Sequence, residues 1–400
     1  MGSAAAERNV PMSVVYLRPG RDGPVRGGNP WIFSQAIGRV EPAGIEPGTQ
    51  VEVRDAGGDL LGAGYYNPNT TIAVRMLAWG APGADLIERR LKAALALRRA
   101  LVRDDTDAYR LVNGEGDGLP GVVADRYRDV IVLQLLTAGA DRMREALAGS
   151  IGELAGPRAI IERSRGAVRK QEGLDDRDGV LAGETIAETI ATENGIKFVV
   201  DFVHGQKTGA FLDQRENHAR AGELARGARV LDAYCYGGGF ALAALAGGAS
   251  QVVAIDTSAR ALDWARRNLE LNGHSRDGAE FVHGEAARYM AETDRRFDLV
   301  VLDPPPLARS RADAERAGRL YAELNTLAMK VLAPGGRLMT FSCSAHVRGE
   351  DFIRAVRIGQ TRAGRMMRLL AHLGAGPDHP VLLGHVEGEY LTGLLLAALG

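Results

Sequence analysis

Cysteine is scarce in this chain of 400 residues, which contains only Cys235 and Cys343. Two cysteines allow at most one disulfide, so the fold cannot rest on a disulfide framework, and either thiol is free for chemistry. Long apolar runs are lacking as well: no stretch approaches the ~20 uninterrupted apolar residues of a membrane span, and the N-terminus has no basic segment followed by an apolar run. We therefore expect a cytoplasmic protein without membrane contact.

An excess of charge is also missing. The 49 basic and 50 acidic side chains leave a net charge of −1, so any contact with nucleic acid must come from local patches. Hydrophobic residues (46%) and charged residues (25%) have the proportions of a folded globular protein, which argues against long disordered or fibrous segments. At this length we expect two or three domains.

Three parts follow from the pattern of strands, helices and turns. Residues 14–80 hold short β-rich runs between glycine- and proline-containing turns, which predicts a small β-barrel. Residues 81–190 read as a connecting helix, from about 84 to 102, and a central α/β module with one helix near 141–154. In residues 191–400, a hairpin turning at Asn194-Gly195 leads into alternating strands and helices, which predict a parallel sheet covered by helices.

A glycine-rich turn follows the first strand of this last part, where Asp232 precedes Tyr234, Tyr236, Gly237, Gly239 and Phe240. Glycine lets a backbone turn sharply and approach a ligand closely, although such turns also occur for structural reasons alone. Asp256 ends the next strand, 19 residues after Gly237, where a carboxylate can accept hydrogen bonds from ribose hydroxyls. Together these features predict a site for an adenosine-containing cofactor.

The kind of cofactor depends on the space near the turn. A dinucleotide needs a third glycine, which would fall at Leu242, and a helix N-terminus cleared for its pyrophosphate. The bulky aromatic side chains of the turn favour a cofactor without phosphates, such as S-adenosyl-L-methionine. Glu285, in Gly284-Glu285-Ala286 after the third expected strand, is a candidate for the adenine amino group.

The reactive residues are expected at the carboxyl ends of two later strands, the edge where open α/β sheets bind ligands. An apolar strand delivers Asp303-Pro304-Pro305, and a neighbouring strand ends in Ser342-Cys343-Ser344. A pyrimidine carbon is too weak a nucleophile to attack a sulfonium methyl group directly. The hypothesis is that the thiolate of Cys343 adds to C6 of a cytosine and activates C5, while Asp303 holds N3 and the exocyclic amine.

These motifs together resemble a known family, the large-subunit ribosomal RNA (cytosine-5-)-methyltransferases, which combine a PUA domain, a central α/β module and a Rossmann-like catalytic domain. The resemblance runs from about Val14 to the C-terminus. Besides the stretches above, it is carried by residues 29–34 (NPWIFS), 114–121 (GEGDGLPG), 204–209 (HGQKTG), 212–215 (LDQR) and 378–380 (DHP). The chain departs from the family at Pro306 and Leu307, where Lys and Phe are usual, and at Ala322, where a basic residue is common.

The resemblance implies S-adenosyl-L-methionine as cofactor, large-subunit ribosomal RNA as partner, and a nucleophilic Cys343 assisted by Asp303. It allows a homodimer, and no metal is expected. The expected cofactor contacts are Lys207, Thr208, Gly209, Asp213, Gln214, Arg215, Asp232, Tyr234, Tyr236, Gly237, Gly239, Phe240, Asp256, Thr257, Glu285, Ala286 and Pro304.

Two groups of basic residues are candidates for RNA contact or simply solvated faces: Arg18, Arg21 and Arg26 in the first part, and Arg163, Arg165, Arg169 and Lys170 in the second. Two other functions stay open. Methylation of a guanine would not need Cys343 as a nucleophile, and a catalytically silent RNA-binding assembly factor could keep the same fold. A nicotinamide dehydrogenase is opposed by Leu242.

Overall fold

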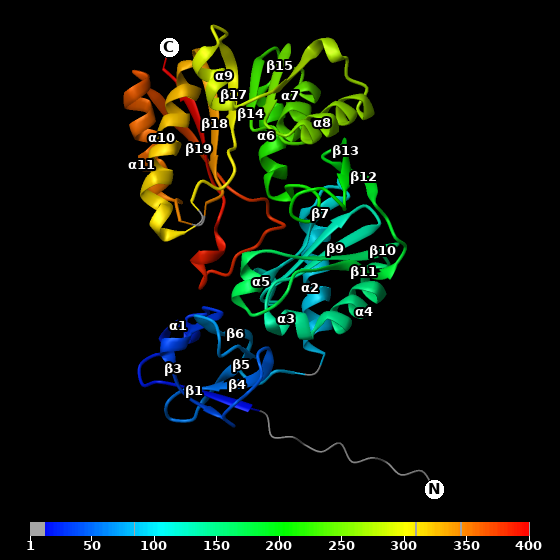
Figure 1. The fold of residues 1–400 in the computed structure, drawn as a ribbon, viewed down its shortest axis with the longest axis vertical. Helices are drawn as coiled ribbons and strands as arrows, with labels where there is room; N and C mark the ends of the chain where they lie inside the picture. Colours follow the sequence, from blue (N-terminus) through cyan, green and yellow to red (C-terminus); the bar gives the residue numbers. More distant parts are fainter. Residues whose placement is uncertain (1–12, 84, 309, 345, 400) are drawn as a thin grey trace.

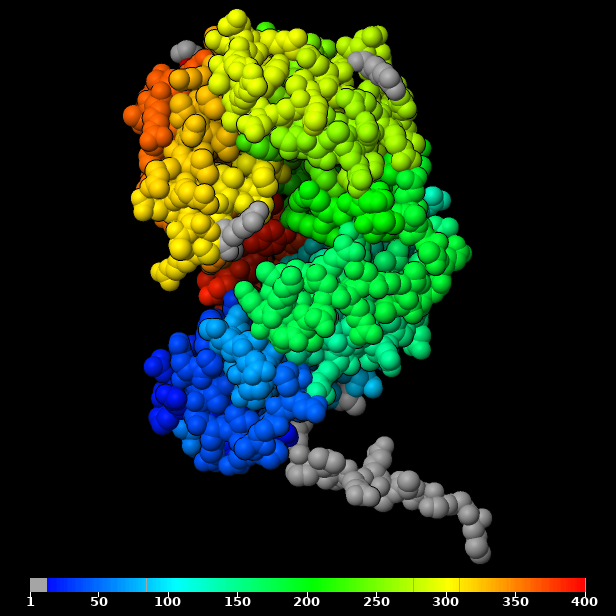
Figure 2. All heavy atoms as spheres, in the orientation of Figure 1, coloured from blue at the N-terminus to red at the C-terminus, as the bar shows by residue number. Residues whose placement is uncertain are grey.

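The computed structural model describes residues 13–83, 85–308, 310–344 and 346–399. Three bodies follow one another along the chain (Figure 1), each organised around its own sheet. In Figure 2, a hollow lies between the yellow and green parts of the surface, and the red part of the chain is visible in it. This hollow is where the later parts of the chain meet.

The N-terminal body is a six-stranded sheet, ordered β2-β6-β5-β4-β1-β3. Its elements are β1 (Ser13–Leu17), α1 (Gly23–Arg26), β2 (Trp31–Phe33), η1 (Ser34–Ala36), β3 (Ile37–Glu41), β4 (Thr49–Arg54), β5 (Leu60–Tyr66) and β6 (Ile72–Trp79). Alternate residues of three strands, among them Val15, Val51 and Val74, meet in one apolar cluster. Because successive side chains of a strand point to opposite faces, the sheet must wrap around this cluster, as the predicted β-barrel requires.

The central body is a five-stranded sheet, ordered β11-β10-β9-β8-β7. Its elements are α2 (Leu86–Leu101), β7 (Ala108–Asn113), η2 (Gly114–Asp117), β8 (Val122–Tyr127), β9 (Val130–Leu135), α3 (Ala138–Arg142), α4 (Arg144–Ala155), β10 (Ala159–Ser164), α5 (Ala167–Gln171) and β11 (Arg177–Gly183). Ala84, where the connecting helix was expected to start, lies outside the described residues.

The single helix expected near 141–154 is instead two helices, α3 and α4, which meet at Met143. The Thr137 hydroxyl accepts a hydrogen bond from Ala140 N and so caps a separate short helix before Arg144. The expected hairpin is confirmed as β12 (Glu188–Glu193) and β13 (Ile196–Asp201), and both turn residues have positive φ. The hairpin covers the face of the central sheet that the helices leave open.

The C-terminal body is a seven-stranded sheet, ordered β16-β15-β14-β17-β18-β20-β19, in which only β20 runs against its neighbours. Its elements are η3 (Leu212–Gln214), α6 (Arg215–Leu224), β14 (Arg229–Ala233), α7 (Gly239–Ala246), β15 (Gln251–Asp256), α8 (Ala259–Leu271), η4 (Arg276–Gly278), β16 (Ala279–His283), α9 (Ala286–Glu292), β17 (Phe297–Leu302), η5 (Arg311–Asp313), α10 (Ala314–Lys330), β18 (Leu332–Ser342), α11 (Glu350–Ala363), β19 (Met367–Leu373), η6 (Val386–Gly388) and β20 (Thr392–Ala398). The parallel sheet covered by helices is thus confirmed.

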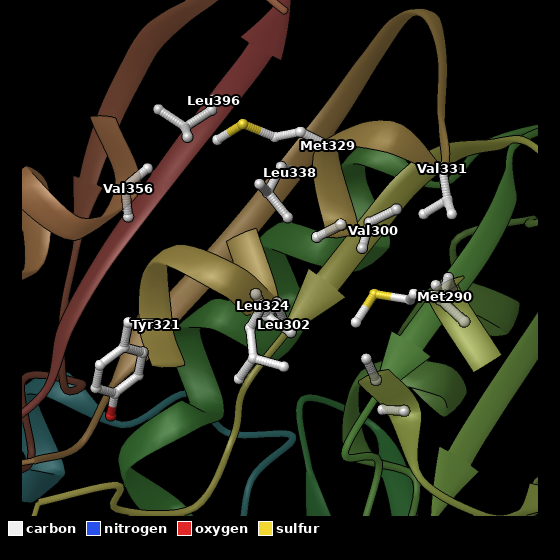
Figure 3. Close-up of a cluster of buried hydrophobic side chains, with 14 of the residues drawn as sticks. Met290, Val300, Leu302, Tyr321, Leu324, Met329, Val331, Leu338, Val356 and Leu396 are labelled. Carbon is white, nitrogen blue, oxygen red and sulfur yellow. The ribbon is translucent and has the colours of Figure 1, made fainter. Parts of the chain in front are cut away.

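Helices cover both faces of this sheet, which explains the unbroken apolar run of four residues, Leu299 to Leu302, in its central strand β17. Val300 and Leu302 of β17 face the cluster under α9, α10 and α11, as Figure 3 shows. Leu299 and Val301 of the same strand face the cluster under α6, α7 and α8. The polar residues that follow each strand therefore emerge together at the carboxyl edge of the sheet.

Candidate active site

The glycine-rich turn after β14 is held by the carboxylate that ends β15. Asp256 accepts hydrogen bonds from Tyr236 N at 2.9 Å and from Ser258 N at 2.8 Å. Tyr234, Tyr236 and Gly238 all have positive φ, so the turn is tightly wound. Sequence spacing alone placed Asp256 near this turn, and the structure joins the two directly.

A pocket opens beside the turn and collects residues from six elements and the loops between them. Its lining includes Phe198, Gly209, Phe211, Gln214, His218, Tyr234, Tyr236, Gly237, Gly239, Phe240, Trp264, Asn268 and Asp303. The ring of Tyr236 contacts both Phe211 and Trp264 edge-on, with centroids 5.1 and 5.7 Å away. A Cβ on Gly239 would lie 2.6 Å from the His218 ring, so only glycine fits beside this histidine.

Seven of the expected cofactor residues line this pocket: Gly209, Gln214, Tyr234, Tyr236, Gly237, Gly239 and Phe240. Sequence reasoning missed Phe198, His218 and Trp264. These three come from the hairpin, α6 and α8, and no motif or fixed spacing links them. Only the folded sheet brings them to the glycine turn.

Thr257, Glu285 and Ala286 lie near the ends of β15 and β16, outside the pocket lining. Gly284 N donates to Asp256 O at 3.0 Å, which places this segment beside the turn. Burial raises the pKa of Tyr234 to about 12, and the charge of Glu285 adds to the shift, so these two side chains are neighbours. Ala286 is buried in the core below α9.

Asp232, Thr208 and Arg215 are buried and have protein partners. Asp232 accepts a hydrogen bond from Ala241 N at 2.9 Å, so it anchors the first turn of α7 rather than lining the pocket. Burial raises the pKa of Asp232 to about 7. The Thr208 hydroxyl is 2.8 Å from that of Tyr127, which ties the loop before η3 to the central sheet.

The expected reactive residues meet where β17 and β18 end side by side. Cys343 Sγ lies 3.7 Å from the carbonyl oxygen of Pro304, the residue after Asp303. Asp303 accepts a hydrogen bond from Gln214 Nε2 at 2.9 Å, and Gln214 lies on η3. The sulfur, the carboxylate and the glycine turn are thus on the same edge of the sheet, as the hypothesis of cysteine chemistry requires.

Both reactive groups are shifted toward their neutral forms. Burial raises the pKa of Asp303 to about 7, and the negative charge of Asp213 adds to the shift. Burial also raises the pKa of Cys343 to about 12, with a further contribution from Asp303. The serines flanking the thiol are both buried: Ser342 donates to Val347 O, and the Ser344 hydroxyl lies 3.0 Å from that of Tyr321. Only the thiol of this triplet is partly exposed.

Beside this pair lies a group of linked polar residues. Lys207 Nζ is 2.8 Å from Asp213 Oδ2, and the Tyr390 hydroxyl donates to the same oxygen at 2.7 Å. We call Lys207, Asp213, Asp303, Cys343 and Tyr390 the crevice. Tyr390 belongs to the connection between β19 and β20, and no sequence motif pointed to it.

A second group of buried charges, which we call the joint, fastens the same connection to the central body. Its members are Arg98, Arg110, Asp117, Arg215 and Asp378. Arg98 pairs with Asp117 at 2.5 Å and donates to Asp378 O at 2.7 Å. Asp378 Oδ2 accepts from Arg215 at 2.8 Å and from Arg110 N at 2.9 Å. Although burial disfavours its charge, His379 and Arg215 lower the pKa of Asp378 to about 2.

Two of the four residues of the basic cluster in the second part of the chain are buried, and the other two, Arg165 and Lys170, are exposed, so the cluster offers fewer open charges than the sequence indicated. Arg163 is buried and donates to Gly205 O at 2.7 Å, and Arg169 is buried and pairs with Asp141 at 2.8 Å. Arg165 is exposed but pairs with Asp178. In the first group, Arg26 pairs with Asp22 and Asp55, and Arg18 donates to Ile37 O.

Within the described ranges, no helix is long and apolar enough to cross a membrane. The same residues contain no group of three or more His, Cys, Asp or Glu side chains arranged to hold a metal ion.

The fold and the site define a class of protein: an S-adenosylmethionine-dependent methyltransferase that carries a PUA-like domain. The family model described as S-adenosylmethionine-dependent methyltransferase matches residues 109–382, and the model of a PUA-like domain matches residues 15–79. The chain belongs to this methyltransferase family, whose cofactor is S-adenosylmethionine. The site fits that cofactor, since Asp256 ends β15 beside the glycine turn and the pocket is lined by aromatic side chains and Leu242.

Relatives extend over nearly the whole chain. "Ribosomal RNA large subunit methyltransferase I" of Photobacterium profundum is 42% identical over 387 residues, which cover 95% of this chain and 98% of the relative. The protein of the same name from Aeromonas hydrophila is 40% identical over 393 residues, 96% and 99% of the two chains. The chain is thus a member of the family that includes these two enzymes.

Solved structures show the same fold at low sequence identity. A SAM-dependent methyltransferase from Streptococcus mutans has a TM-score of 0.81 and 18% identity, covering 96% of this chain and 99% of its own. A second structure, of a methyltransferase complexed with SAH, has the same TM-score, 19% identity and the same coverage. The arrangement of all three bodies is therefore shared.

Proposed function

We propose that this protein transfers a methyl group to C5 of a cytosine in large-subunit ribosomal RNA, through a covalent adduct between Cys343 and C6 of the base. The single observation that carries the cytosine assignment is the place of the Cys343 thiol, beside Asp303-Pro304 on the edge of the sheet that also carries the cofactor pocket. The ribosomal RNA substrate is inferred from the names of the relatives and from the PUA-like domain.

The proposed division of labour gives each residue one task. Tyr234, Tyr236, Gly237, Gly239, Phe240, Gly209 and Gln214 form the walls against the cofactor, and Asp256, Thr257, Glu285, Ala286 and Pro304 extend its site along the sheet edge. S-adenosylmethionine supplies an electrophilic methyl group when bound. The proposal includes a cytoplasmic location and allows a homodimer.

On the base, Cys343 acts as the nucleophile and Asp303 handles the proton. Asp303 takes the thiol proton of Cys343, and Sγ then bonds to C6 while the C5–C6 electron pair moves toward N3. Asp303 passes the proton to N3, and its raised pKa lets the carboxyl group hold the proton between the two transfers. C5 becomes enamine-like and nucleophilic enough to accept a methyl group. A base then removes the C5 proton, the C5–C6 double bond forms again, and the Cys343 thiolate leaves C6.

The test uses an RNA that carries 5-fluorocytosine. The normal adduct breaks down when C5 loses its hydrogen as a proton, and fluorine in that position cannot be removed in this way, so the adduct is trapped. We expect the parent protein to form a covalent complex on Cys343 and not on Cys235, as read by peptide mass spectrometry. Cys343→Ser should form no complex and lose at least ~10³-fold in methyl transfer while still binding cofactor.

Product analysis separates the other functions. Nucleoside mass spectrometry of ribosomal RNA from cells lacking the protein should show the loss of one 5-methylcytosine. Loss of a methylguanine, with Cys343→Ser as active as the parent, would establish the guanine alternative instead. Cofactor binding without methyl transfer to any ribosomal RNA would establish the silent assembly factor.

A further inference from the structure

The backbone of Lys207 has a positive φ of 52°, a conformation that residues other than glycine rarely adopt. Both neighbours are fastened: Gln206 N donates to the Tyr236 hydroxyl at 3.0 Å, and the Thr208 hydroxyl lies 2.8 Å from that of Tyr127. A strained residue persists where its surroundings hold it, and such residues cluster at functional sites. The loop therefore holds Lys207 in place against its local preference.

The ammonium of Lys207 is only partly engaged. Nζ is 2.8 Å from Asp213 Oδ2 and 4.4 Å from the centre of the Phe211 ring, and the side chain is 39% exposed. An ammonium carries three donors, so this one has donors left after its bond to Asp213. Because Phe211 also lines the cofactor pocket, those donors lie at the mouth of the site.

Asp213 fixes the direction of the ammonium. Its side chain is 5% exposed, and one oxygen, Oδ2, accepts from both Lys207 and the Tyr390 hydroxyl. Although burial disfavours the carboxylate, Lys207 and His379 hold the pKa of Asp213 well below its usual range. Asp213 is thus a charged carboxylate held by two hydrogen bonds, and it fixes the position of the Lys207 ammonium.

The ammonium lies beside the two reactive groups. Its charge acts on both Asp303 and Cys343, and in each case it favours the ionised form. Burial and the negative charges of Asp303 and Asp213 oppose a thiolate at Cys343, so this cation offsets them. A cation in this position can also stabilise negative charge that develops on a bound base.

We propose that Lys207 is a catalytic residue that donates a hydrogen bond to the carbonyl oxygen O2 of the target cytosine, with Asp213 and Tyr390 as its positioning residues. The assignment rests on the proposed function, and it differs from the cofactor contact that the family resemblance implies. When Sγ bonds to C6, the displaced electron pair spreads over N3 and O2. N3 receives its proton from Asp303, and Lys207 holds O2 without giving up a proton.

The first experiment compares Lys207→Met with Lys330→Met. Lys330 ends α10, next to Val331, whose carbonyl accepts from Phe297 N at the opposite edge of the sheet. We expect Lys207→Met to lose ~10²–10³-fold in single-turnover methyl transfer at saturating cofactor, while the Kd for S-adenosylhomocysteine changes by less than about threefold. Lys330→Met should match the parent in both. A large rise in Kd with a normal saturated rate would overturn the proposal and make Lys207 a cofactor contact.

The second experiment tests the positioning residues. Tyr390→Phe removes only the hydroxyl that supports Asp213, and we expect ~10-fold lower kcat with an unchanged KM for RNA, as one hydrogen bond to a charged group is worth. In Lys207→Met, alkylation of Cys343 should require higher pH than in the parent, since the thiolate then faces Asp303 and Asp213 without the cation. An unchanged alkylation profile with only reduced stability would show a structural role and sink the assignment.

The 5-fluorocytosine RNA separates this inference from the proposed function. If the parent protein forms no covalent complex, the cytosine chemistry itself fails. If the parent forms the complex and Lys207→Met forms it equally fast, the cytosine chemistry stands and only the role of Lys207 fails.

Discussion

The joint and the crevice are two clusters of polar side chains that each include one residue of the connection between β19 and β20, and they treat a buried carboxylate in opposite ways. In the joint, the Asp378 carboxylate accepts from the Arg215 guanidinium and from Arg110 N and lies beside His379, so it stays ionised with a pKa of about 2. In the crevice, Asp303 has an amide as its partner and its pKa rises to about 7. A buried carboxylate paired with a cation, such as Asp378, holds the fold together, and we call its charge matched. A buried carboxylate without a paired cation, such as Asp303, keeps a shifted pKa that suits proton transfer, and we call its charge mismatched.

The largest effect should come from removing the mismatched acid. Asp303→Asn keeps the shape of the side chain and an oxygen that can accept the hydrogen bond from Gln214, but an amide cannot take up and release a proton as a carboxylate does. We expect methyl transfer to fall ~10²–10⁴-fold, while at neutral pH the variant unfolds at a temperature no lower than that of the parent. An Asp303→Asn protein that is active but poorly folded would reverse the comparison, as read by methyl transfer and calorimetry on the same preparation.

Removing a matched charge should do the opposite. Arg98 is 1% exposed, and Arg98→Met leaves Asp117 buried without its partner. We expect the free energy of unfolding to fall by ~3–5 kcal/mol, as measured by urea denaturation. Methyl transfer per folded molecule at low temperature should stay within a few-fold of the parent, and a selective loss of kcat would show that the joint also serves catalysis.

The backbone of the joint can be tested without touching charge. A Cβ on Gly116 would overlap the carbonyl oxygen of Pro380, so Gly116→Ala must push the connection away from the central body. We expect a loss of ~2–3 kcal/mol, in the range of overpacked sites. Gly149→Ala in α4 is the matched control: a Cβ there meets nothing within 4 Å, and the change should stabilise the helix by ~0.5–1 kcal/mol.

The two acids should also respond to pH with opposite signs. The raised pKa of Asp303 contributes stability that is complete below the unfolded value of about 3.9 and is lost as pH rises through about 7. The lowered pKa of Asp378 contributes stability above about 3.9 that is lost as pH falls through about 2. Denaturation of Asp303→Asn should therefore show a stability difference from the parent that changes by on the order of 4 kcal/mol between pH 4 and pH 8. An equal difference at both pH values would contradict the shift.

The sequence predicts those parts of the site whose residues directly follow a strand or lie within one short turn. Asp256 and the turn at Gly237 were expected together because parallel strands of one sheet deliver their ends to the same edge. The hairpin at Asn194 was expected because its turn is local. In each case a short stretch of chain contains the whole signal.

The rest depends on contacts across long separations or on burial. Tyr390 and Asp213 are 177 positions apart, and the sequence around either residue contains no motif that predicts their contact. Arg163 and Arg169 looked like a basic patch because a sequence shows charge but not depth, and both prove to be buried. Asp232 likewise lies in β14 just before the turn that lines the cofactor pocket, but its carboxylate accepts a hydrogen bond from the first turn of α7.

The order of strands in the third sheet has a consequence for how the chain matures. β20 lies between β18 and β19, yet it follows both in sequence. During vectorial synthesis, β19 has no strand to pair with until the segment 374–391 has passed over the central body and β20 has inserted. Because Tyr390 lies on that segment, its hydrogen bond to Asp213 forms only after the last strand has been made, so the crevice is the last part of the molecule to be completed.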